Sequence, residues 1–494
     1  MLQTESDALL ETTLSLESAS AAERYRQTKI IFTIGPATAD EEVLRQLIEE
    51  KVDICRLNMA HGSREWTREI VRKVRSVCSQ VGRQIAILMD IKGPEIRTGE
   101  LAAPVQLEKG QQFDFWMSRE AALGAVGGVI GVEVNYPGLA GDVNVGDRVL
   151  VDSGLIHLEV LSKSADWIRC KVLIPGVLGN RRHINLPGVR VGLPSLTDKD
   201  RADVALGLEE GVDFYALSFV RDAAAVADLR AVLEEAESKA RIIAKIEDQQ
   251  AIRNIEEIID ASDGVMVARG DLGIECPFEE LPIIQHHVVR SCIRKGRAVI
   301  VATHMLESMI DAPVPTRAEV SDVAHAVLQK ADAIMLSGET TTGKFPVECV
   351  RVFKKIAHRI EGLHHEEPTR DLSLPTAKGK MLRAAVSLAN EIGDSGIVVF
   401  SRSGYLARML SSLRPRVPVY AYTDIPELFR HLLILWGVEP FLMKFSEDPE
   451  DTIRNAFEYL KRRNWVRDGQ TLVVITNALA KEKVIDTMQI RTVQ

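Results

Sequence analysis

The chain of 494 residues is long enough for several domains, because a single domain commonly holds ~100–200 residues. Apolar residues make up 46% and charged residues 27%, which is typical of folded globular proteins and unlike disordered, collagen-like or disulfide-stapled chains. The 61 basic residues against 70 acidic ones give a net charge of −9, which disfavours a general attraction to nucleic acid or to anionic membranes. An anionic substrate therefore requires a local cluster of cationic side chains.

Residues 1–27 are rich in Ser, Thr, Glu and Ala. They lack the basic start and the apolar stretch of a signal peptide, and their acidic character is unlike that of a transit peptide, so we expect a polar extension. No apolar run approaches the ~18 residues that a membrane-spanning helix needs. The six cysteines are scattered without a Cys-x-x-Cys pair, as is typical of reduced thiols. These features predict a cytoplasmic protein with no membrane partner.

Eight short apolar runs, rich in β-branched residues, alternate with amphipathic helical stretches between residues 28 and 364. Nearly continuous apolar strands are typical of a parallel sheet that is covered on both faces. Several helices are expected to begin at an aspartate cap, at Asp198, Asp222 and Asp248. Eight such units favour a (β/α)8 TIM-type barrel over a doubly wound open sheet. The strands are predicted at Lys29–Ile34, Asp53–Met59, Ile85–Asp90, Phe214–Phe219, Ile242–Ile246, Gly264–Ala268, Ala298–Ala302 and Asp332–Leu336.

The interval between the third and fourth strands is the longest, and its residues differ in pattern from the rest. Polar and apolar residues alternate in segments such as Ile156–Leu161, between turns rich in Gly, Pro and Asn, which predicts a small inserted β domain. A polar linker after His364 leads to an α/β domain with strands at Ile397–Phe400, Val419–Tyr422, Pro440–Met443 and Thr471–Ile475. The predicted domains are an extension (1–27), the barrel (28–99 and 192–364), the inserted domain (100–191) and a C-terminal α/β domain (375–494).

Charged or hydroxyl side chains follow all eight predicted barrel strands, at the end where such barrels hold their active sites. Lys245 and Glu247 are two residues apart on a strand, so they point to the same face, and Asp271 follows the next strand. Neighbouring carboxylates without His or Cys favour a hard cation such as Mg²⁺. Lys245 beside that ion could stabilise charge on a phosphoryl or enolate oxygen. The alternative is an ion pair between strands without a metal.

Arg56, Arg97 and Arg269 follow other strands on the same rim. Together with Lys245 they predict a pocket for a phosphorylated and carboxylated anion. A second motif, Gly338–Lys344, has the glycines and the lysine of a phosphate-binding P-loop. Phe345 stands where that loop requires Ser or Thr, so we disfavour an NTPase P-loop.

From about Thr28 to its end, the chain resembles pyruvate kinases in four stretches: TKIIFTIGPAT, MDIKGPEIRTGE, AKIEDQQAIRNIEEII with VMVARGDLG, and ATHMLESMI with LSGETTTGKFP. The resemblance implies an Mg²⁺-dependent enzyme that transfers a phosphoryl group from phosphoenolpyruvate to ADP, giving pyruvate and ATP in the last step of glycolysis. It also implies that the inserted domain is a small β-barrel lid, that the C-terminal domain is regulatory, and that the chain forms a homotetramer.

The resemblance further implies a role for each residue of the rim. Lys245 would stabilise the transferring phosphoryl group and the enolate, Arg56 would hold the substrate phosphate, and Ser337 and Glu339 would belong to a proton relay. The substrate would be bound by Arg56, Lys245, Gly270, Asp271 and Thr303, and the Mg²⁺ by Glu247 and Asp271. The catalytic set is Lys245, Arg56, Thr303, Ser337 and Glu339. The nucleotide side would comprise Thr33, Pro36, Asn58, His61, Arg97 and Arg182, with Arg182 where the family commonly has Lys.

A monovalent-cation site is also implied, and here the chain departs from the family pattern. The K⁺ ligands would be Asn58, Asp90 and the main chain of Ile91. Ala60 stands where a serine hydroxyl is usual and Ile91 where a Thr is usual, although Glu95 matches K⁺-dependent members. We expect K⁺ stimulation; from the residues alone, Asn58 and Asp90 could equally be capping groups. His304 replaces the usual Gln, with no consequence that we can predict.

The first strand of the C-terminal domain leads into Ser401, Arg402, Ser403 and Gly404, followed by a helix from Tyr405. Hydroxyls and free N–H groups at a helix start favour a phosphate, although a plain loop with capping serines fits as well. The resemblance favours a phosphorylated allosteric effector here. Because the segment Asn477–Asp486 lacks the pattern of members regulated by fructose 1,6-bisphosphate, a sugar monophosphate or AMP stays open, with Trp465 and Arg467 as possible pocket residues.

Two other functions stay open at this point. One is an Mg²⁺-dependent barrel lyase or aldolase acting on pyruvate or phosphoenolpyruvate, which also uses a Glu/Asp pair. The other is a non-catalytic, effector-sensing homologue, which is expected to have lost Lys245, Glu247 or Asp271, and all three are present.

Overall fold

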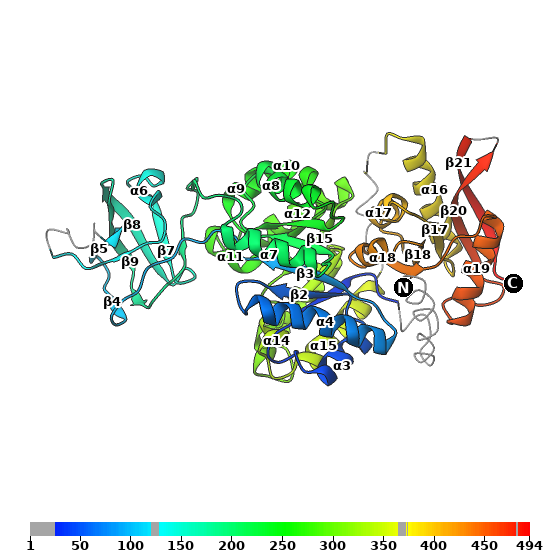
Figure 1. Ribbon diagram of the computed structural model, residues 1–494, viewed down its shortest axis with the longest axis horizontal. Helices are drawn as coiled ribbons and strands as arrows, with labels where there is room; N and C mark the ends of the chain where they lie inside the picture. Colours follow the sequence, from blue (N-terminus) through cyan, green and yellow to red (C-terminus); the bar gives the residue numbers. More distant parts are fainter. Residues whose placement is uncertain (1–24, 120–127, 364–371, 373, 481–482) are drawn as a thin grey trace.

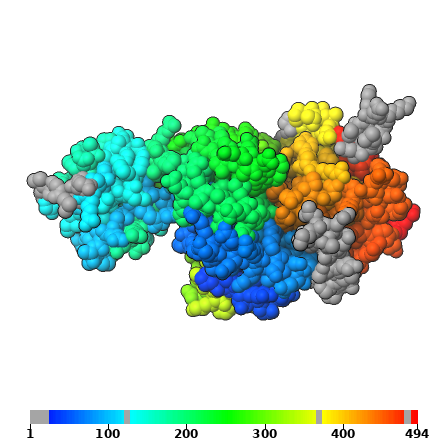
Figure 2. Space-filling model, in the orientation of Figure 1, coloured from blue at the N-terminus to red at the C-terminus, as the bar shows by residue number. Residues whose placement is uncertain are grey.

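The computed structural model describes residues 25–119, 128–363, 372, 374–480 and 483–494. Residues 1–24 of the predicted extension and the predicted linker 364–371 lie outside the described residues. Three bodies follow one another along the molecule, with the inserted domain and the C-terminal domain at opposite ends of a central barrel (Figure 1). Figure 2 shows the inserted domain projecting from one end of the barrel surface.

The central body is a closed barrel of eight parallel strands in the order β1-β16-β15-β14-β13-β12-β3-β2. The strands are β1 (Lys29–Thr33), β2 (Ile54–Asn58), β3 (Ala86–Ile91), β12 (Phe214–Leu217), β13 (Arg241–Ile246), β14 (Gly264–Ala268), β15 (Ala298–Ala302) and β16 (Ala333–Leu336). All eight overlap the predicted strands, and the predicted fold class is confirmed. Successive side chains alternate between two cores: Ile30 and Phe32 of β1 pack under the helices, whereas Ile31 fills the barrel interior.

Helices surround the strands and cover their outer faces (Figure 1). Asp222 and Asp248 cap α8 and α9 as predicted, each accepting a backbone N–H three residues on. The prediction of Asp198 as a cap is wrong by one residue, because Thr197 caps α7 and Asp200 completes a reciprocal capping box. The barrel helices are α3 (Glu41–Glu49), α4 (Arg64–Val81), α7 (Asp198–Glu209), α8 (Ala223–Glu235), α9 (Gln249–Arg253), α10 (Ile255–Ala261), α11 (Arg269–Glu275), α12 (Leu281–Lys295), η2 (Glu307–Ile310), α13 (Arg317–Leu328), α14 (Gly338–Thr341) and α15 (Pro346–Glu361).

The inserted domain is built on a six-stranded sheet in the order β11-β7-β8-β9-β5-β6, with a separate β10-β4 pair. Its pairs are antiparallel except for β5 with β6, and apolar residues such as Phe113, Phe115 and Val160 form its own core. The elements are β4 (Val105–Leu107), β5 (Gln112–Trp116), β6 (Gly131–Glu133), α6 (Leu139–Asp142), β7 (Arg148–Val151), β8 (Ile156–Lys163), β9 (Trp167–Ile174), β10 (Gly176–Leu178) and β11 (Ile184–Asn185).

The C-terminal domain has a five-stranded sheet in the order β19-β18-β17-β20-β21, in which only the β20–β21 pair is antiparallel. Among the described residues, no helix is both long and apolar enough to cross a membrane. The domain comprises α16 (Ala377–Ile392), β17 (Ile397–Phe400), α17 (Tyr405–Ser412), β18 (Val419–Thr423), α18 (Pro426–Leu432), β19 (Val438–Leu442), α19 (Pro449–Arg462), β20 (Thr471–Ala480) and β21 (Lys483–Thr492).

A buried ion pair joins the barrel to the C-terminal domain. Arg414, after α17, donates to both carboxylate oxygens of Asp332, at 3.1 and 2.7 Å, and both side chains are 2% exposed. The same carboxylate accepts the backbone N–H groups of Val299 and Trp436 at 3.0 Å. The Asp332 carboxylate therefore contacts both a barrel strand and the C-terminal domain.

Substituting Asp332→Asn is expected to destabilise the protein by ~3–5 kcal/mol, because it leaves the Arg414 charge buried and unpaired. Differential scanning calorimetry would show this as a clearly lower unfolding midpoint. The matched control is Asp468→Asn, which removes an exposed partner of Lys461 and should leave the midpoint unchanged. Equal midpoints for the two variants would contradict the structural role of the buried pair.

Candidate active site

A network of charged side chains connects the carboxyl ends of neighbouring barrel strands. Asp90, at the end of β3, accepts from Arg56 Nε of β2 at 2.7 Å and from Lys245 Nζ of β13 at 3.2 Å. Arg56 also donates to Thr33 Oγ1 at 3.0 Å, and Lys245 Nζ lies 2.9 Å from Glu247 Oε1. Because parallel strands present their carboxyl ends at one rim, residues far apart in the sequence meet here.

Burial and neighbouring charges oppose each other in this network. Burial alone would lower the pKa of Lys245, but the charges of Asp90 and Glu247 outweigh it and raise that pKa, so the ammonium stays charged. Burial alone would raise the pKa of Asp90, but Arg56 and Lys245 lower it. The pKa of Glu247 is raised, because burial and the nearby Asp271 outweigh the attraction of Lys245. Burial and a second nearby carboxylate thus disfavour the charged form of Glu247, although Lys245 contacts it.

Ser218 belongs to the same network, although the sequence did not lead us to assign it a role. Its hydroxyl lies 2.7 Å from Lys245 Nζ and donates to the Ile91 carbonyl at 2.8 Å, next to Asp90. A hydroxyl directly after a barrel strand was the available signal, but the type of residue alone could not tell that it orients the lysine.

A second group of residues lies around the short helix α11. The hydroxyl of Thr303, after β15, accepts the backbone N–H of Gly270 at 2.7 Å and donates to the Ala302 carbonyl. Thr303 and His304 both have positive φ angles, of 68° and 53°, which non-glycine residues rarely adopt. The strained turn thus holds the threonine hydroxyl against the first turn of α11, which carries Asp271.

Arg269 differs from its predicted place among the substrate-binding cations. It is 7% exposed, and its guanidinium donates to the carbonyls of Ala302, Thr303 and His304 and to Asp322 at 2.7 Å. The N–H groups of the guanidinium are thus engaged by backbone carbonyls and by one carboxylate. Arg269 therefore supports the strained turn, and the rim cations that remain are Arg56, Arg97 and Lys245.

Ser337 and Glu339 lie together at the end of β16. The buried carboxylate of Glu339 accepts the backbone N–H groups of Ser337 at 2.7 Å and Leu306 at 2.9 Å. The hydroxyl of Ser337 is buried and has no hydrogen-bond partner among the described residues. A buried hydroxyl without a partner is unusual in folded proteins, and it fits a group that meets a ligand or water.

Glu247 and Asp271 fit the divalent cation that the sequence predicts. The described residues hold no cluster of three or more His, Cys, Asp or Glu side chains that could bind a metal by themselves. Mg²⁺ commonly takes only one or two carboxylates and completes its shell with water and substrate oxygens. A cation would also favour the charged form of Glu247, whose pKa is raised by burial and, to a smaller extent, by the charge of Asp271.

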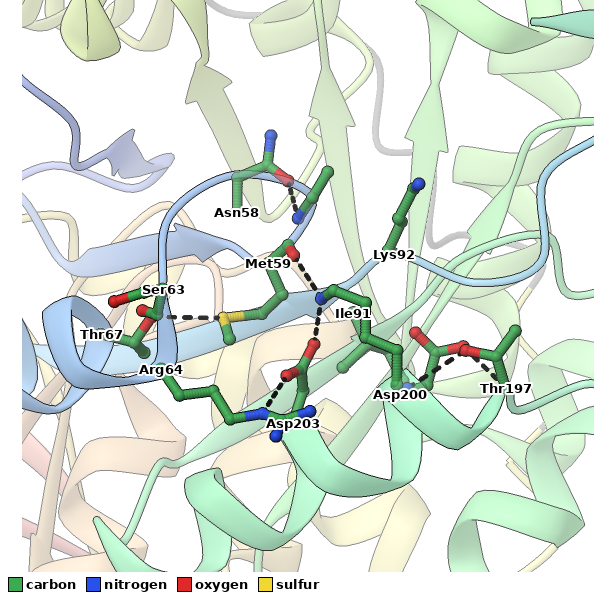
Figure 3. Close-up of polar contacts among 12 residues, drawn as sticks. Asn58, Met59, Ser63, Arg64, Thr67, Ile91, Lys92, Thr197, Asp200 and Asp203 are labelled. Carbon is green, nitrogen blue, oxygen red and sulfur yellow. Dashed lines mark hydrogen bonds and ion pairs between the residues drawn. The ribbon is translucent and has the colours of Figure 1, made fainter. Parts of the chain in front are cut away.

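Two of the predicted nucleotide residues, Asn58 and His61, flank Met59, whose carbonyl accepts from Lys199 of α7 at 2.7 Å. Asn58 is the last residue of β2, and its Oδ1 accepts the Ala60 N–H at 3.1 Å. The exposed His61 lies in the loop that follows. Figure 3 shows Arg64 turned toward Asp203 of α7, a buried carboxylate that accepts from Arg64 Nε at 3.2 Å. The loop is therefore attached to the helix that follows the inserted domain.

The other predicted nucleotide-binding residues are spread over the barrel and the inserted domain. Pro36 is exposed beyond β1. Arg97 donates to Glu95 at 2.6 Å and to the Arg181 carbonyl at 2.8 Å, at the start of the inserted domain. Arg182, in that domain, lies 3.2 Å from Asp152. Arg97 is half-buried and Arg182 is exposed. Both belong to the two chain segments that connect the barrel to the inserted domain, residues 92–99 and 181–193, which we call the hinge.

The P-loop-like motif does not form a phosphate loop. Residues Gly338–Thr341 form α14, and a methyl group at Gly343 would lie 2.3 Å from the Glu339 carbonyl, so backbone fills the space beside this glycine. Lys344 is exposed and pairs with Asp311 at 2.8 Å. This agrees with our rejection of an NTPase P-loop.

The predicted effector loop is a turn before α17. Ser401 Oγ accepts the Gly404 N–H at 2.9 Å and Ser403 Oγ accepts the Tyr405 N–H at 3.4 Å, so both serines make capping contacts. Arg402 is exposed and pairs with Asp424. Trp465 is 7% exposed and packs against aromatic rings of the domain core, whereas Arg467 is exposed and pairs with Asp394. The side chains of 477–485 lie outside the described residues.

Comparisons with known proteins bear on this geometry. The chain matches the family "Pyruvate kinase, barrel domain" over residues 25–350 and "Pyruvate kinase, alpha/beta domain" over residues 380–491. It is 40% identical over 483 residues to plastidial pyruvate kinase 3 of Arabidopsis thaliana, covering 96% of this chain and 83% of the relative. It is 40% identical over 460 residues to a pyruvate kinase of Geobacillus stearothermophilus, covering 91% and 77%.

A crystal structure of a pyruvate kinase from Cryptosporidium parvum has the same architecture. The TM-score is 0.91 at 33% sequence identity, and the match covers 98% of this chain and 99% of that one. The barrel, the inserted domain and the C-terminal domain are thus all included in the likeness. The chain belongs to the pyruvate kinase family and is a phosphotransferase enzyme.

Proposed function

We propose that this enzyme transfers the phosphoryl group of phosphoenolpyruvate to ADP, giving pyruvate and ATP. The observation that carries the proposal is Lys245, a buried ammonium held by Asp90, Ser218 and Glu247 at the barrel rim. Phosphoryl transfer needs alignment and neutralisation of oxygen charge more than a covalent partner. A fixed, charged lysine beside two carboxylates suited to Mg²⁺ supplies that need.

Different residues of the rim bind different groups of the substrate. Lys245 neutralises the charge on the transferring phosphoryl group and then on the enolate oxygen, and Arg56 binds the phosphate. The backbone at Gly270 and the hydroxyl of Thr303 seat the substrate carboxylate. Glu247 and Asp271 would hold Mg²⁺, which supplies further positive charge to the phosphate and carboxylate oxygens when bound.

The enolate left after phosphoryl transfer must gain a proton at C3. Ser337 is the candidate for this step, because its buried hydroxyl has no partner among the described residues and can therefore bind water or substrate. Glu339, held by two backbone N–H groups, fixes the Ser337 main chain. We assign the two residues to the proton relay.

The nucleotide binds between the rim and the inserted domain in this proposal. Thr33, Pro36, Asn58 and His61 lie on the barrel side, and Arg97 and Arg182 come from the hinge and the inserted domain. Rotation of the inserted domain toward the barrel would bring the arginines over the phosphates and exclude water. Unchanged small-angle scattering on adding Mg²⁺, oxalate and ATP would count against this closure.

The alternatives are less well supported. A pyruvate-directed lyase or aldolase has no use for Arg97, for the inserted domain or for the C-terminal domain. A non-catalytic homologue is expected to have lost Lys245, Glu247 or Asp271. The match of both pyruvate kinase domain families favours the kinase over a lyase or aldolase.

Several finer features stay proposals. We propose a homotetramer in the cytoplasm, although the similar proteins include chloroplastic forms. We also propose that the turn Ser401–Gly404 binds a phosphorylated effector, supported by its position before a helix with the exposed Arg402. The domain boundaries after residues 27, 99, 191 and 364 are likewise predictions.

Substitution of Lys245 tests the proposed function. Lys245→Met removes the central positive charge and should lower kcat for ATP formation from phosphoenolpyruvate and ADP by at least about 10³-fold, as expected for a buried group that stabilises transition-state charge. The matched control is Lys344→Met, in the P-loop-like motif, which should keep wild-type kinetics. A robust rate in Lys245→Met, or a similar loss in both variants, would refute the assignment.

A second prediction concerns K⁺. Asn58, Asp90 and the Ile91 carbonyl can bind a monovalent cation, but Ala60 lacks the hydroxyl of the family pattern. We expect higher activity in K⁺ than in tetramethylammonium at equal ionic strength, and a lower K⁺ requirement in Ala60→Ser, because serine adds an oxygen ligand. Equal rates of the wild-type enzyme in the two salts would contradict the proposed K⁺ stimulation.

A further inference from the structure

The helix α11 contacts both the proposed substrate site and the inserted domain. Its first turn carries Gly270 and Asp271, and its last residue is Glu275. Figure 1 shows α11 at the end of the barrel nearest the inserted domain. The helix is only seven residues long, so its two ends are about two turns apart.

Two contacts connect α11 to the sheet of the inserted domain. Asn185 belongs to β11 and pairs with Leu150 of β7, and its Nδ2 donates to Glu275 Oε1 at 3.0 Å. In the turn between β7 and β8, a methyl group at Gly154 would lie 3.2 Å from Ile274 Cγ2. The inserted domain thus hydrogen-bonds to Glu275 and passes close to Ile274, the last two residues of α11.

Both partners of the hydrogen bond are buried, Asn185 at 4% exposure and Glu275 at 7%. The Glu275 main chain is also fixed to the barrel, because its carbonyl accepts from Gln249 Nε2 of α9 at 2.6 Å. A buried carboxylate that loses such a donor is costly to leave unpaired. The contact therefore favours one orientation of β11 relative to α11.

The hinge is not tightly packed around this bond. A cavity of about 320 Å³ is lined by residues of the hinge, including Asn185 and Val189, by residues 247–250 of the barrel and by Glu275. Asn185 Oδ1 has no hydrogen-bond partner among the described residues. The Asn185–Glu275 hydrogen bond is thus a directional contact beside open space, and the hinge has room to turn about it.

From this geometry we propose that Glu275 is a positioning residue that links the orientation of the inserted domain to the substrate site on α11. The inference rests on the proposed function, in which Gly270 and Asp271 meet the substrate and the inserted domain closes over the nucleotide. Filling the site at one end of α11 then favours the closed orientation through Asn185 at the other. Substrate and nucleotide bind with mutual coupling as a consequence.

The coupling is measured as the ratio of ADP dissociation constants without and with saturating oxalate, at constant Mg²⁺. Oxalate should tighten ADP binding to the wild-type enzyme. We expect the ratio to fall at least about threefold in Asn185→Ala and in Glu275→Ala, and no further in the double variant, because both changes break one contact. Glu275→Gln keeps an acceptor for Asn185 and should retain most of the ratio.

The matched control is Asp114→Asn, which removes a buried carboxylate that pairs with Arg169 inside the inserted domain, away from α11. It should lower the unfolding midpoint and leave the ratio unchanged. Should Glu275→Ala fail to fold, the ratios of ADP dissociation constants in Asn185→Ala and Glu275→Gln test the inference. A wild-type ratio of one, or wild-type ratios in Asn185→Ala and Glu275→Ala, would overturn the inference, whereas ATP formation by the wild-type enzyme tests the proposed function separately.

Discussion

The carboxylate of Asp90 is the charge around which the catalytic rim is arranged. It is 2% exposed, and a carboxylate this far from water needs cationic partners to remain ionised. Arg56 and Lys245 provide them from two other strands, and each then contacts a further rim residue, Thr33 and Glu247 respectively. One buried negative charge thereby fixes two positive groups at the place where an anionic substrate is expected.

A net charge of −9 is compatible with this arrangement because the cations are concentrated and oriented. The charge of the whole chain governs long-range attraction, whereas the rim acts over a few ångströms in a partly desolvated setting, where interactions are stronger. The carboxylates of Glu247 and Asp271 lie near the Lys245 ammonium, so the rim offers groups of both signs. A substrate bearing phosphate and carboxylate groups requires cations, and the Mg²⁺ that would assist it requires carboxylates.

The barrel could be predicted from the sequence because each of its strands is buried on both faces and reads as a short apolar run, as in Gly264–Ala268 and Ala298–Ala302. The inserted domain was predicted only in outline, because strands as short as Ile184–Asn185 carry too little periodicity. The two-residue spacing of Lys245 and Glu247 at the end of β13 indicated that their side chains share a face. The ion pair between them is consistent with that prediction.

Contacts that depend on tertiary structure escaped prediction. Nothing in the sequence distinguishes Arg269, which is occupied by backbone carbonyls, from Arg56, which faces the rim. Ser218 and Glu275 act through partners that are 27 and 90 residues away, Lys245 and Asn185, and a single sequence does not reveal such pairs. Residue type therefore predicted the chemistry of the site, and folding determines which side chains perform it.

The central claim is that Asp90 holds Lys245 and Arg56 in their working positions. It is tested most directly by measuring kcat for ATP formation by Asp90→Asn, with circular dichroism and the thermal unfolding midpoint used to establish that the variant is folded. The account predicts a loss of at least about 10²-fold in kcat, because both cations lose the charge that orients them. A folded Asp90→Asn enzyme with wild-type kcat would contradict it.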